Sequence, residues 1–344
     1  MNDRTRYIGG SDVAGILGVS AWSSPLKVYL EKRGEAEPPD EEDRKRERIL
    51  ERGRREEPHI IADLEKLTPI KVTKRSAPSA PNRYVDPEVP YFAAEIDAEW
   101  LVTREAVDYL RLERGIEIPE ALIGTTQNLE AKTAHPFVAM KKFGDEGTDE
   151  MPIEYFTQCL HGLGVTGRQV TLLALAVYVD DPILYLVRRD DEMLSQMRER
   201  LRRFREDHVL AGVPPAPLDG LLADVYRMLK RRRATRLAAD EEVAGMIRTL
   251  KALNARAYTT EEGINAVKFE IGCRIIGQAE MEKPTKKDLG RHVILVDGQP
   301  ALTIALEEQE RIDAERLRRE HPQIAASVAK TIRFYKYNLS RAKS

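Results

Sequence analysis

Apolar and polar residues alternate along the chain in patterns that predict short helices first and strands afterwards. The earliest pattern is helical over 11–18, with Ser11 as the expected N-cap and Gly18 at the end, and a second helix is expected over 25–34. A third, highly charged helix is expected over 41–67, where sparse apolar residues form a narrow stripe.

Beyond residue 68 the pattern changes to one that is typical of strands. The expected elements are strands at 69–74, 91–102, 109–112 and 127–132, a helix at 153–164, strands at 170–179 and 183–187, and an arginine-rich helix at 190–211. A helix, several strands, a helix and two more strands predict a mixed α/β fold, with a central mixed sheet flanked by helices.

A proline-rich segment at 212–217 predicts a domain boundary, with one domain over 1–212 and a second over 213–344. The second domain is expected to be mainly helical. Its expected elements are a helical region at 221–254, a short hairpin of strands 292–296 and 301–304 joined by Asp297-Gly298, and helices at 307–320 and 323–337.

Composition narrows the class of protein. The chain is 42% hydrophobic and 33% charged, and its longest apolar run is too short to cross a bilayer. No apolar segment of the secretory type follows the N-terminus, so we expect a cytoplasmic protein. The chain has only two cysteines, Cys159 and Cys273, so a four-cysteine zinc or iron–sulfur site is excluded. They are far apart in sequence, so a structural disulfide is possible but not expected.

The net charge of −2 hides an asymmetry between the two parts of the chain. Residues 1–220 carry 31 basic and 40 acidic side chains, whereas residues 221–344 carry 24 and 17. A basic C-terminal part can attract phosphate, and an acidic N-terminal part can hold cations. Charge alone, however, favours ordinary solvated surfaces over either of these functions.

Four carboxylate and lysine positions carry the candidate chemistry. Asp97 stands inside a strand-like run, where aspartate is disfavoured. Glu130 and Lys132 are two residues apart on a predicted strand and therefore share a face, while Glu57 lies on the long charged helix. Magnesium prefers oxygen ligands and keeps several waters, so two carboxylates on adjacent strands can hold it beside a phosphate. A third carboxylate can complete this site or recruit a second ion.

Two further polar residues, Gln158 and His161, lie one helical turn apart on the helix over 153–164. Each of these features alone is common. A glutamate and a lysine on an exposed strand edge are usually a solvated pair, and Glu57 lies in a run of charges typical of a surface helix. The alternative of plain surface residues therefore stays open for each position taken singly.

The order of the motifs resembles the YqaJ-like viral recombinase family, in the same superfamily as phage lambda exonuclease, over about residues 4–210. The matching features are Ile8-Gly9-Gly10-Ser11-Asp12-Val13-Ala14-Gly15-Ile16-Leu17-Gly18, Trp22, Ser24-Pro25, Tyr29-Leu30-Glu31-Lys32, Gly53 to Pro58, Asp97, Glu130 to Lys132, and Gln158 with His161 and Gly162.

The resemblance implies a restriction-endonuclease-like PD-(D/E)XK core and a magnesium cofactor, for which manganese can substitute. It implies roles for the following residues: Asp97 and Glu130 as metal ligands with the Ala131 carbonyl as a further one, Lys132 as the catalytic lysine, Glu57 as a helical metal-site carboxylate, Gln158 as a site-ordering residue, His161 as a possible site residue, and Ser11 and Arg4 as contacts of the DNA end.

The sequence departs from the family pattern at two places. The 32 residues between Asp97 and Glu130 exceed a compact hairpin, so we expect an extra hairpin or a lid over DNA. Ala131 replaces the usual leucine or isoleucine, which loosens packing without changing the chemistry. Because neither departure removes a catalytic residue, we expect an active enzyme.

The leading hypothesis is a 5′-to-3′ exonuclease of double-stranded DNA ends that acts in phage-type recombination, in the host cytoplasm if the chain is phage-encoded. Its expected partners are DNA ends, a single-strand annealing protein and further copies of the chain, with no membrane. One alternative is a restriction-like or structure-specific endonuclease. Another is a non-catalytic DNA-binding or assembly protein built around the basic C-terminal part.

Overall fold

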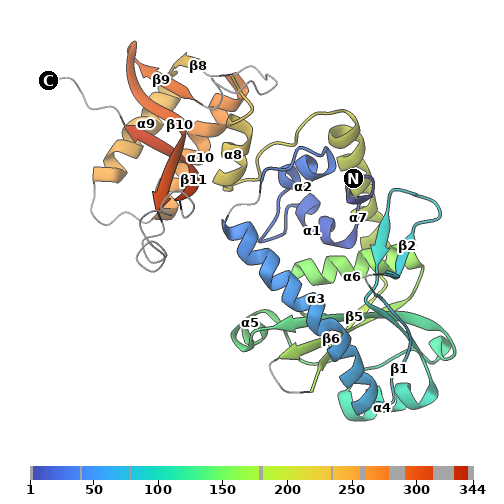
Figure 1. Cartoon of the computed structure of the whole chain (residues 1–344). Helices are drawn as coiled ribbons and strands as arrows, with labels where there is room; N and C mark the ends of the chain where they lie inside the picture. Colours follow the sequence, from blue (N-terminus) through green and yellow to red (C-terminus); the bar gives the residue numbers. More distant parts are fainter. Residues whose placement is uncertain are drawn as a thin grey trace. The chain divides into compact units, whose positions relative to one another are not determined.

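The computed structural model describes residues 3–38, 41–77, 79–177, 181–233, 235–255, 261–278, 291–312 and 329–339. The chain divides into two compact units, residues 1–216 and 217–344, which Figure 1 shows with their elements labelled. The predicted boundary at residue 212 lies just before this division. None of the helices in the described ranges is long and apolar enough to cross a membrane.

The first unit is a mixed sheet with helices on both faces. Its elements are α1 (Gly10–Leu17), α2 (Pro25–Lys32), α3 (Glu41–Leu67), β1 (Lys71–Arg75), β2 (Arg83–Val85), β3 (Ala93–Glu95), β4 (Ala98–Leu101), α4 (Arg104–Arg114), β5 (Thr126–Ala134), α5 (Pro136–Lys142), α6 (Ile153–Thr166), β6 (Val170–Val177), β7 (Ile183–Arg188), α7 (Asp191–Arg203) and the π-helical turns of Phe204–Leu210. The sheet order is β1-β4-β5-β6-β7, in which β5 and β6 are parallel and the other pairs antiparallel. The predicted mixed α/β fold is confirmed.

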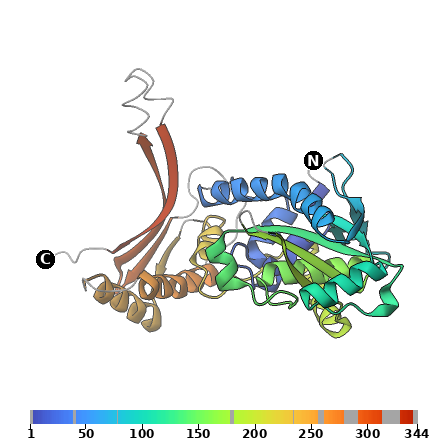
Figure 2. The ribbon, with the colours of Figure 1, turned by 90° about the horizontal axis from the view of Figure 1, so that it is seen from below.

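Alternating side chains of the strands build two cores, one on each face of the sheet. On one face, apolar residues of α3 and α4 pack with Trp100, Leu129 and Leu172. On the other face, Cys159 and Leu163 of α6 pack with residues of β6 and β7. Figure 2, a view turned by 90°, shows α3 lying alongside the strands. The strand β5 therefore lies between α3 on one face of the sheet and α6 on the other.

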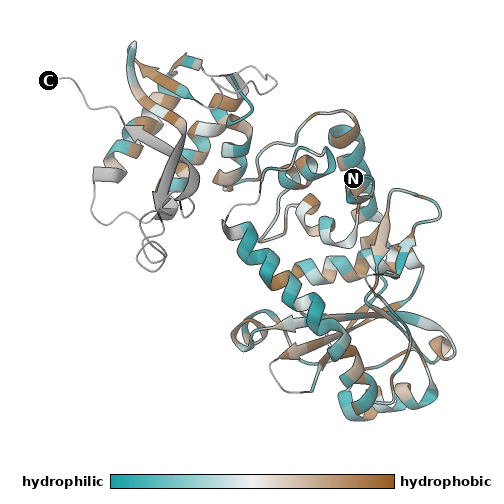
Figure 3. Ribbon diagram, in the orientation of Figure 1, coloured by the Kyte–Doolittle hydropathy of each residue, from teal (hydrophilic) through white to brown (hydrophobic). Residues whose placement is uncertain are grey.

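The long helix α3 is held by few apolar contacts. Figure 3 shows it as mostly hydrophilic along its length. Its buried side chains are Ile60, Ile61 and Leu64, all in its C-terminal half, whereas Ile49 and Leu50 are exposed. Because helix stability in proteins depends mostly on packing of one face, these three residues anchor α3 on the sheet.

The predicted strand at 109–112 is wrong, because residues 104–114 form the helix α4. The Thr103 hydroxyl accepts from the Ala106 N–H at its start, and Gly115 ends it with a φ of 66°. Val107 and Leu110 are buried in the core, at the spacing of a helical face. The long segment before Glu130 is thus a helix packed on the sheet, where an extra hairpin or a lid was expected.

The first helix begins earlier than the sequence suggests. Its N-cap is Gly9, whose N–H donates to the Asp12 carboxylate at 2.8 Å, and Ser11 lies inside the first turn. The expected cap at Ser11 is therefore wrong, because Asp12 already satisfies the helix start. Gly18 ends the helix with a φ of 74°, as predicted. The second helix begins at Pro25 as expected, with the Ser24 side chain accepting from the Lys27 N–H, and it ends at Lys32, two residues before the expected end.

The second unit contains more strand than predicted. Its elements are α8 (Leu222–Leu229), β8 (Thr235–Ala238), α9 (Glu241–Ala255), α10 (Glu261–Gln278), β9 (His292–Val296), β10 (Gln299–Ile312) and β11 (Ala329–Leu339). The sheet order is β11-β10-β9-β8. The strand β8 interrupts the expected helical region at 221–254. Asp297 and Gly298, with φ of 51° and 73°, form the predicted hairpin turn.

The two C-terminal helices predicted for this unit are wrong within the described residues. Residues 307–312 continue β10, and residues 329–337 belong to β11, which pairs with β10 in antiparallel register (Figure 2). The glutamates at 307, 308 and 310 suggest a helix, but pairing with the β-branched and aromatic residues of β11 overrides that preference. Residues 313–328 lie outside the described ranges.

Candidate active site

The predicted strand at 91–102 changes partners at Asp97. Before it, β3 pairs with β2, and after it, β4 pairs with β1 and β5. The Asp97 carbonyl accepts from the Ser76 N–H at 2.8 Å, so its backbone is bonded where the strand breaks. Aspartate is tolerated here because the residue lies at a junction of two sheets rather than within a ladder.

The junction brings the Asp97 carboxylate to the middle of β5. Ala98 pairs with Leu129, and the Ala131 N–H donates to Asp97 Oδ2 at 3.0 Å. Glu130 and Lys132 are two residues apart on β5 and point to the same face of the sheet, as predicted. Two adjacent strands therefore present one carboxylate each, with a lysine beside them.

The ammonium group of Lys132 lies between the two carboxylates. Its Nζ is 2.5 Å from Glu130 Oε1 and 3.6 Å from Asp97 Oδ2. Burial lowers the pKa of Lys132, but the charges of Glu130 and Asp97 outweigh this effect and hold it well above its ordinary value. The lysine side chain therefore carries a positive charge into a nearly closed, acidic site.

Glu130 is the most buried of the acidic groups in this site. Its Oε1 accepts a hydrogen bond from Gln158 Nε2, so α6 contributes directly to the site. Burial and the charge of Asp97 raise the pKa of Glu130 to about 8. A Cβ on Gly10 would lie 2.9 Å from Gln158 Cγ, which shows that the start of α1 packs against this glutamine. Gly10 is therefore required for close packing of α1 on α6.

Glu57 of α3 joins the same electrostatic cluster. Burial and the charge of Asp97 raise its pKa, while Lys132 and Arg54 oppose the rise. The structure thus gathers Glu57, Asp97, Glu130 and Lys132, which come from separate segments of the chain, around the middle of β5.

The oxygen donors of this cluster fit a hard cation. Within the described ranges, no group of three or more acidic, histidine or cysteine side chains is arranged to hold a metal ion by itself. Magnesium does not require one, because it commonly binds one or two carboxylates and keeps its remaining ligands as water. Asp97 and Glu130, with the neighbouring Ala131 carbonyl, offer an oxygen set of this kind. Glu57 is the additional carboxylate on the helical side.

His161, one helical turn from Gln158, has contacts of its own with β3 and the residue before it. It is buried, and its Nε2 is 3.0 Å from the Ala93 carbonyl oxygen. Its ring meets Phe92 edge to face at 5.8 Å, and burial lowers its pKa. These contacts give His161 a structural role in joining α6 to β3.

Arg4 and Ser11 lie together at the start of the chain. Arg4 Nη2 donates to Ser11 Oγ at 2.8 Å, and both side chains are exposed. Lys32 fixes this arrangement, because its Nζ donates to the Arg4 carbonyl at 2.8 Å and to the Asp12 carboxylate at 2.6 Å. Ser11 follows Gly10, which packs against Gln158, and Gln158 in turn donates to Glu130. Arg4 and Ser11 are therefore linked to the carboxylate site by these contacts. The anchoring role of Lys32 was not predicted from the sequence.

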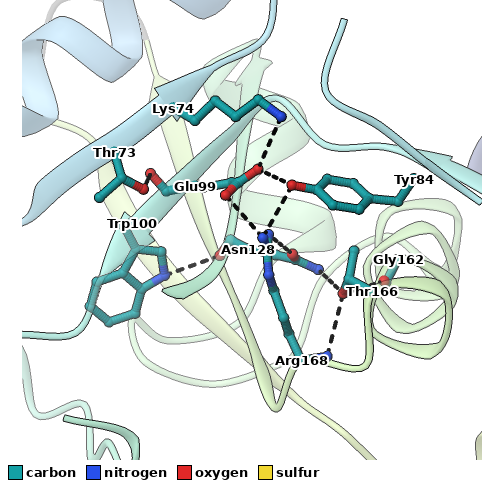
Figure 4. Close-up of polar contacts among 9 residues, drawn as sticks. All are labelled: Thr73, Lys74, Tyr84, Glu99, Trp100, Asn128, Gly162, Thr166 and Arg168. Carbon is teal, nitrogen blue, oxygen red and sulfur yellow. Dashed lines mark hydrogen bonds and ion pairs between the residues drawn. The ribbon is translucent and has the colours of Figure 1, made fainter. Parts of the chain in front are cut away.

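A second polar network, which sequence analysis missed, lies on the same strands and is drawn in Figure 4. Arg168 Nη2 is 2.9 Å from Glu99 Oε2, and Arg168 Nη1 donates to Asn128 Oδ1 at 2.8 Å. The Tyr84 hydroxyl donates to Glu99, and Lys74 Nζ lies 3.7 Å from the same carboxylate. Glu99 and Asn128 are register partners, so the network joins β4 to β5 two residues from Asp97 and Glu130.

Comparisons with known proteins give a family match and several similar chains. Residues 1–169 match the profile of the YqaJ-like viral recombinase domain. The Bacillus subtilis (strain 168) protein YqaJ is 24% identical over 341 residues, which cover 98% of this chain and 92% of that protein. The crystal structure of an alkaline exonuclease (LHK-Exo) from Laribacter hongkongensis has a TM-score of 0.43 and 16% identity, covering 61% of this chain and 91% of that chain. The same exonuclease in complex with dAMP has a TM-score of 0.41 and 18% identity over the same shares.

Proposed function

Residues 1–169 are a YqaJ-like viral recombinase domain, and on this premise we propose that the protein is a magnesium-dependent deoxyribonuclease. The observation that carries the proposal is the convergence of Asp97, Glu130 and Lys132 around the middle of β5. We place the activity in residues 1–212 and assign the basic module at 213–344 to contacts with DNA or partners. The alternative of a non-catalytic DNA-binding protein gains no support from this intact set of residues.

The chain's own residues divide the work of phosphodiester hydrolysis. Asp97, Glu130 and the Ala131 carbonyl would hold a magnesium ion, with Glu57 as a further carboxylate, and the bound ion would neutralise charge on the scissile phosphate and activate a water. Lys132 is within reach of both carboxylates and orients that water or offsets charge on the phosphate. Gln158 holds Glu130 by its hydrogen bond and so keeps the carboxylate in its ligating position.

We further propose exonuclease action on double-stranded DNA ends, in the 5′-to-3′ direction, as part of phage-type recombination. Arg4 and Ser11 support the polarity, because they offer a cation and a hydroxyl at the start of α1, the helix that packs on Gln158. In this role the enzyme produces single strands that an annealing protein binds. We also expect it to work as an oligomer. Manganese is expected to substitute for magnesium.

Digestion of linear and closed-circular duplexes tests the proposed function. We expect wild-type protein with magnesium to degrade linear DNA and to leave closed circles intact. Activity should be lost with a chelator, and calcium should support DNA binding with little cleavage because its looser coordination misplaces the water. Nicking of closed circles would instead identify an endonuclease. Full activity in chelator, or a requirement for zinc, would contradict the proposed site.

The polarity is tested by the chemistry of the DNA end. Wild-type protein should digest a 5′-phosphorylated duplex about tenfold faster than a 5′-hydroxyl duplex, because hydrogen bonds to charged groups contribute about 1.5–3 kcal/mol. Ser11→Ala should reduce this preference, since it removes the hydroxyl but keeps a good helix former in the first turn of α1.

Ser195→Ala on α7 is the matched control, because Ser195 is also an exposed helical serine of the first unit. This variant should keep the full preference of wild type. Equal wild-type rates on the two ends, or digestion that begins at the 3′ end, would contradict the role of Ser11 and Arg4.

A further inference from the structure

The short helix α5, which directly follows strand β5 (Figure 1), exposes apolar side chains instead of burying them. Phe137 is 69% exposed, Met140 is 80% exposed, and Val138 is also exposed. No residue of this helix is buried. Exposed apolar residues gathered on one element commonly mark an interaction surface.

The helix is nevertheless held in place beside the active site. Ala139 and Phe143 pack at the edge of the core beneath α6. Phe143 lies 6.1 Å from the ring of Tyr155, and the same ring lies 5.8 Å from Lys132 Nζ. The C-terminal end of α5 is therefore connected to the catalytic lysine through one aromatic side chain.

The exposed side of α5 has the chemistry of a nucleobase-binding surface. The rings of His135 and Phe137 are stacked, with centroids 5.4 Å apart and planes at 21°, and the Phe137 N–H donates to His135 Nδ1. Two exposed lysines, Lys141 and Lys142, end the same helix. Aromatic faces on which bases stack, with cations that follow the phosphate backbone, are the features of single-strand binding sites.

We propose that His135 and α5 form a base-stacking surface for single-stranded DNA beside the active site. This inference rests on the proposed function, since it supplies the strand that a nuclease would leave unpaired. The surface is defined here by His135, Phe137, Val138, Met140 and the two lysines, and we call it the α5 surface.

A protein partner fits the α5 surface less well than DNA does. Lysine is depleted at protein–protein interfaces, whereas Lys141 and Lys142 border this surface. A stable interface buries about 800 Å² on each partner, and aromatic side chains bury about 150–250 Å² each, so three exposed side chains fall short of that area. Charge complementarity with phosphate therefore favours a nucleic acid.

The proposal is tested by single-strand binding without cleavage. An oligothymidylate that carries a 2-aminopurine is titrated with the full-length protein in calcium, and both affinity and quenching of the base are measured. Phe137→Ala should weaken binding about tenfold and abolish most of the quenching, the scale of one lost base–aromatic stack. Phe137→Trp should retain both the affinity and the quenching of wild type, because the larger ring keeps a stacking face.

Leu112→Ala is the matched control. Leu112 is 73% exposed on α4, so its removal should change neither binding nor quenching. Wild-type affinity and quenching in Phe137→Ala would overturn the proposal. So would a change in oligomeric state for Phe137→Ala without DNA, because the surface would then be covered by another copy.

Failure of this inference is distinguishable from failure of the proposed function. If wild-type protein digests linear duplex and Phe137→Ala binds single strands normally, the nuclease proposal stands and the α5 surface does not. If the wild-type protein digests no DNA but binds single strands, and Phe137→Ala loses this binding, the α5 surface stands and the nuclease proposal does not.

Discussion

Replacing Lys132 with alanine is expected to lower the rate of DNA cleavage about 10²-fold or more while DNA and magnesium still bind. The expected size is that of one positioned electrostatic or proton-transfer group. The reason lies in the position of the ammonium group, which is 2.5 Å from Glu130 and 3.6 Å from Asp97 and is the cation of the carboxylate cluster. Single-turnover cleavage at saturating magnesium measures the chemical step directly.

The surroundings of Lys132 determine how this variant must be measured. Without the lysine, the carboxylates of Asp97 and Glu130 lose a neutralising charge, so their mutual repulsion rises when no metal is bound. Saturating magnesium replaces that charge, and the comparison then isolates turnover from binding. Lys66→Ala, at an exposed lysine of α3, is the matched control and should cleave at the wild-type rate. A wild-type rate in Lys132→Ala would instead show that Lys132 only balances the charge of the carboxylates and takes no part in the chemical step.

Local pattern was sufficient to predict where the site residues lie on their elements. Period-two alternation placed Glu130 and Lys132 on one strand face, and the charged pattern placed Glu57 on a helix; the structure has both. That these residues meet was implied by the order of the motifs rather than by any spacing, because the convergence depends on β4 pairing with β5. No local signal in the sequence encodes that pairing.

The errors have two physical causes: local capping that the pattern of apolar residues did not reveal, and tertiary pairing that overrides local preference. The run at 109–112 is apolar enough for a strand, but Thr103 and Gly115 cap a helix around it and Leu110 completes its buried face. Residues 307–312 are rich in glutamate, yet they extend β10 because β11 pairs with them along its whole length.

The Glu99–Arg168 network was missed because its members come from separate segments that only the fold brings together. Glu99 is on β4, Asn128 is on β5, and Arg168 lies between α6 and β6. The available signal was weak: Glu99 is two residues from Asp97 and so faces the same side of the sheet. An unexplained glutamate on a strand that is otherwise apolar is a reason to look for a buried partner.

Arg168→Ala is expected to destabilise the first unit by about 3 kcal/mol, the lower end of the range for removing one partner of a buried ion pair. The Glu99 side chain is 9% exposed and that of Arg168 is 14% exposed, so solvent replaces little of the lost interaction. Asn128, which is fully buried, also loses its donor from Arg168. Both tryptophans, Trp22 and Trp100, are in the first unit, so tryptophan fluorescence during urea unfolding follows this unit alone.

The cause of that loss can be separated from a general loss of packing by a double variant. Glu99→Gln combined with Arg168→Ala should unfold at a higher urea concentration than Arg168→Ala, because no charge then remains buried without its main partner. Arg111→Ala, at an exposed ion pair with Asp108 on α4, should leave the unfolding midpoint nearly unchanged. If Arg168→Ala unfolds at the wild-type midpoint, the network contributes no net stability. In that case its position between β4 and β5 needs another explanation, since Asp97 and Glu130 stand two residues beyond it on the same strands.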